Sequence, residues 1–177
     1  MSFDIIEVRY DLAADNDRFA ARVRERLNKD GVYLVNLMAS PGAGKTSVLC
    51  RVLDAFPKPL PDLIFLENVG NLVCPAEFDV GADLKLMILS VPEGDDKPLK
   101  YPLMFTVADC MLINKLDTAP IFDFDPARCE GYVRALNPDI AIFPVSAKTG
   151  EGMEAFVAWL AGRVSAALQE KRGRDSL

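Results

Sequence analysis

The residues best suited to chemistry form a short glycine-containing segment after an apolar run. Residues 32–38 read Val-Tyr-Leu-Val-Asn-Leu-Met, and residues 39–46 read Ala-Ser-Pro-Gly-Ala-Gly-Lys-Thr. Glycines permit backbone conformations in which successive N–H groups face one concavity, and the amino end of a following helix adds positive partial charge. In such a loop Lys45 reaches the terminal phosphates of a nucleotide, and the Thr46 hydroxyl ligates Mg²⁺. The segment predicts a phosphate-binding loop rather than a chance turn, although Ala39 stands where the first glycine is usual.

Two further polar segments follow later apolar runs. Positions 114–117 read Asn-Lys-Leu-Asp, and positions 146–148 read Ser-Ala-Lys. A carboxylate can accept hydrogen bonds from both the N1–H and the exocyclic amine of guanine, a donor pair that adenine lacks, so Asp117 would select guanine. Asn-Lys-x-Asp alone is a common surface tetrapeptide. Downstream of a phosphate-binding loop, and followed by Ser-Ala-Lys, it predicts a guanine nucleotide.

The remaining residues of these segments have distinct predicted roles. Asn114 can tie its loop to the phosphate-binding loop, Lys115 can lie along the base, and the Ala147 N–H can donate to the guanine carbonyl. The predicted nucleotide-binding residues are Gly42, Ala43, Gly44, Lys45, Thr46, Ser47, Asn114, Lys115, Asp117, Ser146, Ala147 and Lys148.

These segments require an α/β framework to position them. Besides residues 32–38, apolar strands are predicted at 63–66, 84–91, 110–114 and 140–144, and helices at 46–55, 101–108, 126–137 and 152–171. Such alternation predicts a P-loop NTPase fold: a mostly parallel sheet with helices on both faces, in three α/β/α layers. Asp15 or Asn16 can cap a further helix that runs to about Lys29 and packs through Phe19, Val23 and Leu27. We expect one domain over residues 1–177, with residues 1–31 as a helical extension packed on it.

Composition excludes several classes of protein. The chain of 177 residues has a net charge of −6, which argues against nucleic-acid and membrane binding. The acidic amino terminus has no signal-peptide core, so we expect a cytoplasmic protein. The four cysteines form no Cys-x-x-Cys pair, and the chain has no histidine. Any transition-metal site must therefore use thiolate, carboxylate or backbone ligands.

Two longer segments carry a family resemblance. Residues 66–79 read Leu-Glu-Asn-Val-Gly-Asn-Leu-Val-Cys-Pro-Ala-Glu-Phe-Asp, and residues 91–102 read Val-Pro-Glu-Gly-Asp-Asp-Lys-Pro-Leu-Lys-Tyr-Pro. Together with the phosphate-binding loop and Asn-Lys-Leu-Asp, they closely resemble the HypB family, GTPases that help deliver nickel to [NiFe]-hydrogenase. The resemblance implies GTP or GDP and Mg²⁺ as ligands and a GTP-dependent homodimer. It implies as partners a HypA-type nickel metallochaperone and the hydrogenase large-subunit precursor.

The resemblance also implies roles for single residues. Glu67 would lie near Mg²⁺ and the hydrolytic water, and so act in catalysis with Lys45 and Thr46; the alternative is a solvated carboxylate at a strand end. Cys74 would bind nickel or zinc at the dimer interface; the alternative is a buried thiol. The segment 118–122 corresponds to a dimer contact, in which Phe122 is either an apolar anchor or a core residue. Cys50, Cys110 and Cys129 are predicted packing residues.

The chain departs from the family between the phosphate-binding loop and Glu67. That interval is too short for the extra strand, the first switch region with its aspartate, and the Cys-His metal pair that relatives place there. We expect specific GDP or GTP binding, slow or absent hydrolysis and weak metal binding. The alternative is a catalytically impaired guanine-nucleotide-dependent scaffold; a nucleoside or metabolite kinase is a third possibility. Charged residues on a predicted mobile loop or dimer interface are Asp95, Asp96, Lys97 and Lys100.

Overall fold

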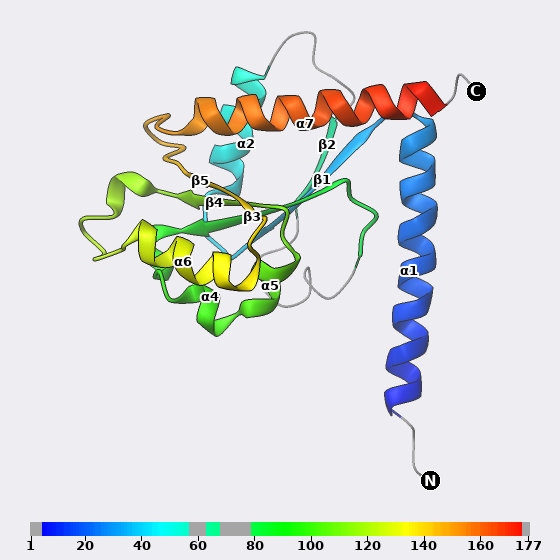
Figure 1. Ribbon diagram of the computed structural model, residues 1–177, viewed down its shortest axis with the longest axis horizontal. Coiled ribbons are helices and arrows are strands. Elements are labelled where there is room, and N and C mark those ends of the chain that lie inside the picture. The colour runs from blue at the N-terminus through cyan, green and yellow to red at the C-terminus, as the bar shows by residue number, and fades with distance from the viewer. Residues whose placement is uncertain (1–4, 57–62, 68–78, 175–177) are drawn as a thin grey trace.

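Five strands form one parallel sheet in the computed structural model, which describes residues 5–56, 63–67 and 79–174 (Figure 1). The strands are β1 (Tyr33–Ala39), β2 (Leu63–Glu67), β3 (Leu84–Ser90), β4 (Cys110–Asn114) and β5 (Ala141–Pro144). They lie in the order β2-β1-β3-β4-β5, and every neighbouring pair is parallel. All seven residues of β1 are buried, as expected for a strand covered on both faces.

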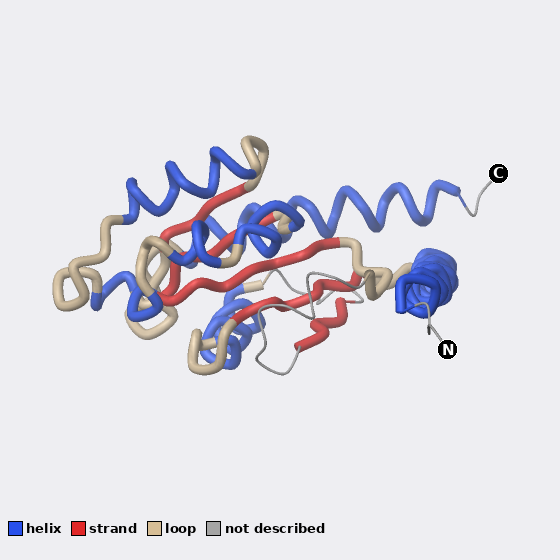
Figure 2. The backbone as a smooth tube through the Cα atoms, turned by 90° about the horizontal axis from the view of Figure 1, so that it is seen from below, coloured by secondary structure: helices blue, strands red, loops and turns tan. Residues whose placement is uncertain are grey.

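Helices cover both faces of the sheet (Figures 1 and 2). One core packs α2 (Lys45–Ala55) and α7 (Met153–Arg174) on residues such as Val35 and Leu37. The other packs α5 (Pro102–Val107) and α6 (Pro126–Leu136) on residues such as Met38. The short elements on the second side are η1 (Val91–Glu93), α4 (Lys97–Lys100) and η2 (Leu116–Thr118). This arrangement confirms the predicted three-layer α/β fold.

The parallel strands place the predicted motifs along one side of the sheet, at the carboxyl ends of the strands. β1 lies between β2 and β3, so the chain leaves β1 towards one side and later returns on the other. Ligands of open α/β sheets bind beyond the carboxyl ends of the strands at such a switch point. The phosphate-binding loop follows β1, and the Asn-Lys-Leu-Asp and Ser-Ala-Lys segments follow β4 and β5. The fold therefore gathers all three motifs.

The first helix, α1 (Ile5–Lys29), is longer than the sequence predicted. Capping at Asp15 or Asn16 is not used, because the helix continues through both residues. Residues 5–14 contain no glycine or proline, so nothing in their backbone chemistry forces a break. The predicted proline connector at 57–61 lies outside the described residues.

The packing of α1 also differs from the prediction. Phe19 is 63% exposed, so its predicted contact with the body is wrong. Val23 is 42% exposed, but its side chain lies beside Gly81, where an added Cβ would be 3.2 Å from the Val23 Cβ. Ala20 is buried, also close to Gly81, where an added Cβ would lie 2.6 Å from the Ala20 carbonyl oxygen. Arg24 adds an ion pair with Asp79 at 2.8 Å. Small residues let the helix approach the body closely, while most of α1 stands away from the sheet (Figure 1). In the described part of the chain, no helix is both long and apolar enough to cross a membrane.

Asp95 has a structural role that the sequence did not predict. Its carboxylate is buried and accepts hydrogen bonds from the Arg128 guanidinium and from the Asp125 N–H at 3.0 Å. These bonds fasten the loop before α4 to the start of α6, so the prediction of a mobile or intersubunit Asp95 is wrong. Burial alone would raise the pKa of Asp95, but the hydrogen bonds and the charge of Arg128 outweigh it and lower that pKa.

Replacing Asp95 with asparagine should destabilise the protein in a pH-dependent way. Because the pKa of Asp95 is lowered on folding, its contribution is present above the ordinary aspartate pKa of about 3.9 and is lost as pH falls through the lower folded value. Urea unfolding should therefore show the largest difference from the parent chain near pH 7 and a shrinking one below about pH 4. Asp96→Asn is the matched control, since Asp96 forms an exposed pair with Lys100. An equal effect of both substitutions at every pH would contradict this account.

Candidate nucleotide-binding site

The turn after β1 has the backbone that the phosphate-binding prediction requires. Gly42 and Gly44 adopt positive φ values of 76° and 91°. A side chain at Gly44 would also collide with Asn114, since its Cβ would lie 2.5 Å from Nδ2. Ala39 is the last, extended residue of β1 and is 2% exposed, so its conformation does not call for a glycine. This explains how the loop forms despite its departure from the usual motif.

The amino-terminal end of α2, which carries positive partial charge, faces this loop. Neither a side-chain cap nor an acidic residue of the first turn occupies it among the described side chains. Lys45, whose side chain is 10% exposed, lies 3.6 Å from the carboxylate of Glu67 at the end of β2. An uncapped helix start beside a lysine suits a bound anion. Ser47 is exposed, and the Thr46 side chain is not among those described.

Asn114 joins the phosphate-binding loop to the loop after β5. Its Nδ2 donates to the Ala43 carbonyl at 2.9 Å, and its Oδ1 accepts from the Ala147 N–H at 3.1 Å. Its side chain is buried, where unpaired amide atoms would be costly. The predicted tie to the phosphate-binding loop is confirmed. The Ala147 N–H, predicted to donate to guanine, donates to Asn114 in this structure, so a bond to a base requires it to share or exchange partners.

Lys115 and Asp117 are held in place by further contacts. Lys115 has a positive φ of 63°, which is uncommon outside glycine, and its Nζ donates to the Gly42 carbonyl at 2.8 Å. The Ser146 hydroxyl donates to Oδ1 of Asp117 at 2.7 Å. Because a carboxylate has about four acceptor positions, Asp117 can still accept from a ligand. The structure thus brings the two predicted base-binding segments together.

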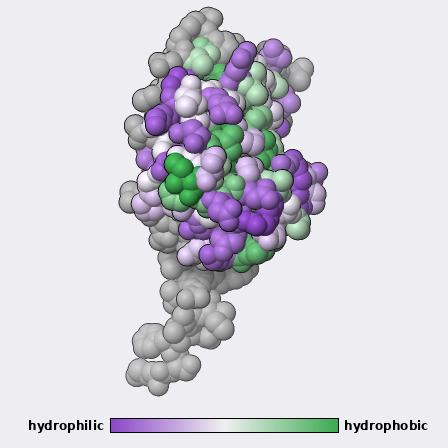
Figure 3. Space-filling view, turned by 90° about the vertical axis from the view of Figure 1, so that its left-hand side faces the viewer, coloured by the Kyte–Doolittle hydropathy of each residue, from purple (hydrophilic) through white to green (hydrophobic). Residues whose placement is uncertain are grey.

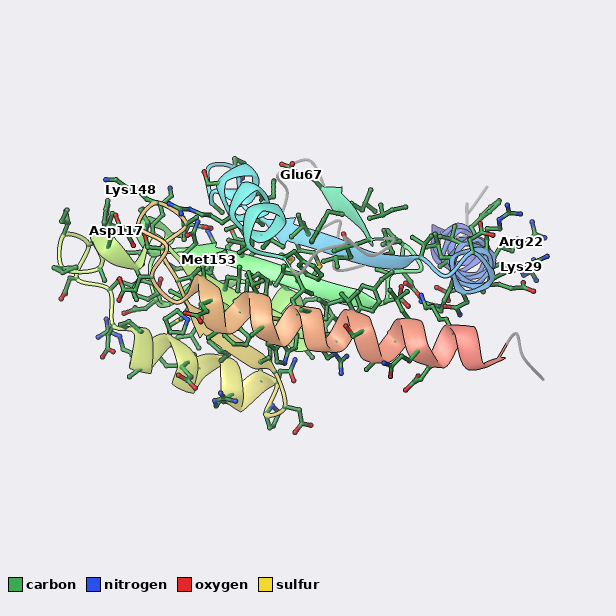
Figure 4. The ribbon with its side chains drawn as sticks, turned by 90° about the horizontal axis from the view of Figure 1, so that it is seen from above. Arg22, Lys29, Glu67, Asp117, Lys148 and Met153 are labelled. Atoms are coloured by element: carbon green, nitrogen blue, oxygen red, sulfur yellow. The ribbon has the colours of Figure 1, made fainter. Side chains whose placement is uncertain are left out.

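The labelled side chains show how the site is laid out (Figure 4). Asp117 and Lys148 lie at one end of the molecule, and Glu67 lies beside α2. The basic residues Arg22 and Lys29 of α1 lie at the opposite end. The basic residues of α1 are therefore remote from the candidate phosphate site.

Arg51 is a contact residue that sequence reasoning missed. It lies on α2, and its guanidinium donates to the carbonyls of Ala147 at 2.8 Å and Lys148 at 2.7 Å. These partners are 96 and 97 residues away in the chain. Nothing in the local sequence distinguishes Arg51 from a solvated helix arginine, so only the folded arrangement could reveal it.

The predicted metal residues are only partly described. Glu67 has the position at the end of β2 that the prediction gave it. Cys74 lies outside the described residues, so its role stays a prediction. Within residues 5–56, 63–67 and 79–174, no three His, Cys, Asp or Glu side chains are grouped in a way that could hold a metal ion.

The other cysteines that can be described are packing residues. Cys110 and Cys129 are buried, which confirms that prediction for both, whereas the side chain of Cys50 is not described. Burial raises the pKa of Cys129 to about 12 and raises that of Cys110 as well. Both thiols therefore stay protonated and do not resemble metal ligands, which bind as thiolates.

Apolar side chains are exposed beside the base-binding segment. Ile121 is 79% exposed and Phe122 is 50% exposed. The core-packing alternative for Phe122 is therefore wrong. The end of the molecule that carries the loops after the strands shows hydrophobic and hydrophilic surface intermixed (Figure 3). The exposure of these two residues leaves the predicted dimer contact at residues 118–122 available as an interpretation.

Comparison with known proteins identifies relatives of this chain. The family described as CobW/HypB/UreG, nucleotide-binding domain, matches residues 55–144. The hydrogenase maturation factor HypB of Azotobacter vinelandii is 36% identical, covering 98% of this chain and 77% of that protein. That alignment extends over 233 positions against the 177 residues of this chain, so at least 56 positions of the relative have no counterpart here. This excess is consistent with the predicted missing segment.

Solved structures of similar proteins agree with the sequence comparison. The crystal structure of the hydrogenase maturation factor HypB from Archaeoglobus fulgidus matches with a TM-score of 0.78 at 31% identity, over 84% of this chain and 98% of that one. The structure of HypB from Helicobacter pylori in complex with nickel matches with a TM-score of 0.76 at 31% identity, over 90% of this chain and 96% of that one.

Proposed function

Because the chain belongs to the HypB family of hydrogenase maturation factors, we propose that it is a guanine-nucleotide-binding GTPase that aids nickel insertion into [NiFe]-hydrogenase. The observation that carries the proposal is the network that joins a phosphate-binding loop to a base-selecting loop. In it Asn114 contacts Ala43 and Ala147, while Ser146 holds Asp117. A guanine nucleotide would use both loops, with its diphosphate at the phosphate-binding loop and its guanine at the base-selecting loop.

The proposed chemistry rests mainly on electrostatic positioning. Loop N–H groups, the start of α2 and Lys45 would bind the phosphates and stabilise the charge that develops during phosphoryl transfer. Glu67, at 3.6 Å from Lys45, is the proposed residue that orients the attacking water. Hydroxyl and carboxylate oxygens suit Mg²⁺, so Thr46 and Glu67 fit that ion, which would neutralise charge on the phosphate oxygens when bound. Hydrolysis is expected to be slow, since the first switch region is predicted to be missing.

The maturation role supplies the proposed cargo and partners. Nickel is the metal present in the similar Helicobacter pylori structure. Cys74 is the proposed soft ligand, with zinc as the competing ion. A homodimer formed through the exposed segment with Phe122, a HypA-type metallochaperone and a hydrogenase precursor are the proposed macromolecular partners.

Replacement of Lys45 by alanine tests the hydrolytic part of the proposal. Mg²⁺-dependent release of phosphate from GTP should fall to the level without protein, because the cation that faces the terminal phosphates is lost. The assay is a phosphate-release measurement on the full chain. Lys29→Ala is the control, since Lys29 lies at the opposite end of the molecule (Figure 4). Unchanged release by the Lys45 variant would refute the assigned role.

A second candidate is a nucleotide-dependent scaffold that binds but does not hydrolyse. At least 56 positions of the Azotobacter vinelandii relative have no counterpart in this chain. If these positions include the predicted missing switch region, groups that sense the terminal phosphate would be absent. Calorimetric binding of GDP in preference to ADP, without release of phosphate from GTP, would select this alternative. Equal affinity for GDP and ADP would refute guanine binding in both forms.

A further inference from the structure

Arg51 connects the helix that starts at the phosphate-binding loop with the loop that would contact the base. It lies six residues after Lys45, about 9 Å further along α2 at 1.5 Å per residue. Its Nε donates to the carbonyl of Ala147 at 2.8 Å, and its second terminal nitrogen donates to that of Lys148 at 2.7 Å. Two bonds from one planar group to adjacent carbonyls define both the position and the orientation of that backbone.

The loop that Arg51 holds is the one that contacts the base-selecting residues. Ser146 donates its hydroxyl to Asp117, and the Ala147 N–H donates to Asn114. The loop also closes on itself, since the Gly150 N–H donates to the Ser146 carbonyl at 2.8 Å. Asn114 and Asp117 thus anchor it from the β4 side, and Arg51 anchors it from α2.

We infer that Arg51 is a positioning residue for guanine selection. This inference rests on the proposed nucleotide binding and extends it. By fixing the carbonyls of Ala147 and Lys148, Arg51 keeps the Ser146 hydroxyl directed at Asp117 and so sets the carboxylate that reads the base. It also couples the two ends of the nucleotide site, because the helix that begins at the phosphates holds the loop at the purine.

A role confined to overall stability fits the surroundings of Arg51 less well. Its side chain is exposed, at the rim of an apolar groove of about 480 Å³ between α2 and α7. Exposed polar contacts contribute little to the free energy of unfolding. The carbonyls that accept from Arg51 lie next to the base-binding groups, so loss of these bonds should be felt there first.

The test compares ligands that use different parts of the site. Calorimetry on the full chain measures GDP, inosine diphosphate, ADP and inorganic pyrophosphate with the parent chain, Arg51→Met and Arg51→Lys. For Arg51→Met we expect GDP affinity to fall roughly tenfold, as for one or two lost hydrogen bonds, while pyrophosphate affinity stays the same. The preference for GDP over inosine diphosphate and ADP should narrow accordingly. Arg51→Lys should retain part of this preference for GDP, because lysine reaches one carbonyl but lacks the planar guanidinium group.

Arg134→Met is the matched control. Arg134 is also an exposed helix arginine that donates to two backbone carbonyls, those of Pro138 and Ile140 at 3.4 Å, but on α6. The Arg134→Met variant should bind GDP, inosine diphosphate, ADP and pyrophosphate with the affinities of the parent chain. Hydrogen exchange in nucleotide-free protein adds a second readout: the Ala147 and Gly150 amides should exchange faster in Arg51→Met than in Arg134→Met.

The outcomes separate this inference from the proposed function. If the parent chain does not prefer GDP to ADP, the proposed function and the inference about Arg51 are both refuted. If it does, and Arg51→Met changes GDP and pyrophosphate affinity equally or changes neither, only the assignment of Arg51 falls. Should Arg51→Met fail to fold, Arg51→Lys decides: a narrowed base preference supports the inference, and an unchanged one refutes it.

Discussion

Asp117→Asn should lower the affinity for GDP by roughly 10²-fold to 10³-fold, because guanine's N1–H and exocyclic amine would then face an amide that cannot accept both bonds. The buried network predicts that this loss is local. Asn114 still connects Ala43 to Ala147, so the phosphate-binding loop keeps its shape. Pyrophosphate affinity should therefore change little. Isothermal titration of GDP and pyrophosphate with both proteins measures the two effects.

The same substitution should also create affinity for a different nucleotide. Xanthosine diphosphate carries a carbonyl where guanosine diphosphate carries the exocyclic amine, and the amide introduced by the substitution could donate to it. The variant should thus bind xanthosine diphosphate more tightly than the parent chain does. If Asp117→Asn lost GDP and pyrophosphate binding together, the carboxylate would have a structural role, and the assigned base contact would be wrong.

Lys171→Met should destabilise the fold by about 3–5 kcal/mol, the usual cost of leaving a buried charge without its partner. The Lys171 ammonium donates to the Val32 carbonyl at 2.7 Å and lies 2.9 Å from the Asp83 carboxylate. Its side chain is 8% exposed and that of Asp83 is 16% exposed. It also lies over the Tyr33 ring at 5.6 Å from the ring centroid. Lys171 therefore clamps the end of α7 to the start of β1, and its loss leaves Asp83 charged and partly buried.

A double variant separates charge from packing in this prediction. Methionine keeps much of the lysine stem, so the main loss in Lys171→Met is electrostatic. Adding Asp83→Asn should recover part of the stability, since the amide oxygen can still accept from the Leu34 N–H that Asp83 now binds at 2.9 Å. Urea unfolding of the parent, both single variants and the double variant measures this as a cycle. A loss below about 1 kcal/mol for Lys171→Met would show that the pair is no more than a surface contact.

The sequence by itself determined the features whose signal is local. Each predicted strand appears within about a residue of its place, because a buried parallel strand requires a continuous apolar run. The proposed phosphate-binding loop and base-selecting motifs could also be located in the sequence, since their glycines and their polar residues act through neighbouring backbone. Because the strands are parallel, the carboxyl ends of β1, β4 and β5 lie on the same side of the sheet. The separate motifs could therefore be assigned to one site.

Tertiary structure alone decided the features that depend on distant partners. Whether Asp95 was mobile or buried, and whether Phe19 packed or faced solvent, depended on Arg128 and on the close approach of Ala20 to Gly81. The contacts of Arg51 and Lys171 join residues 96 and 139 positions apart. A polar side chain's partner is set by which backbone atoms folding brings within about 3 Å, and neither composition nor periodicity records that distance.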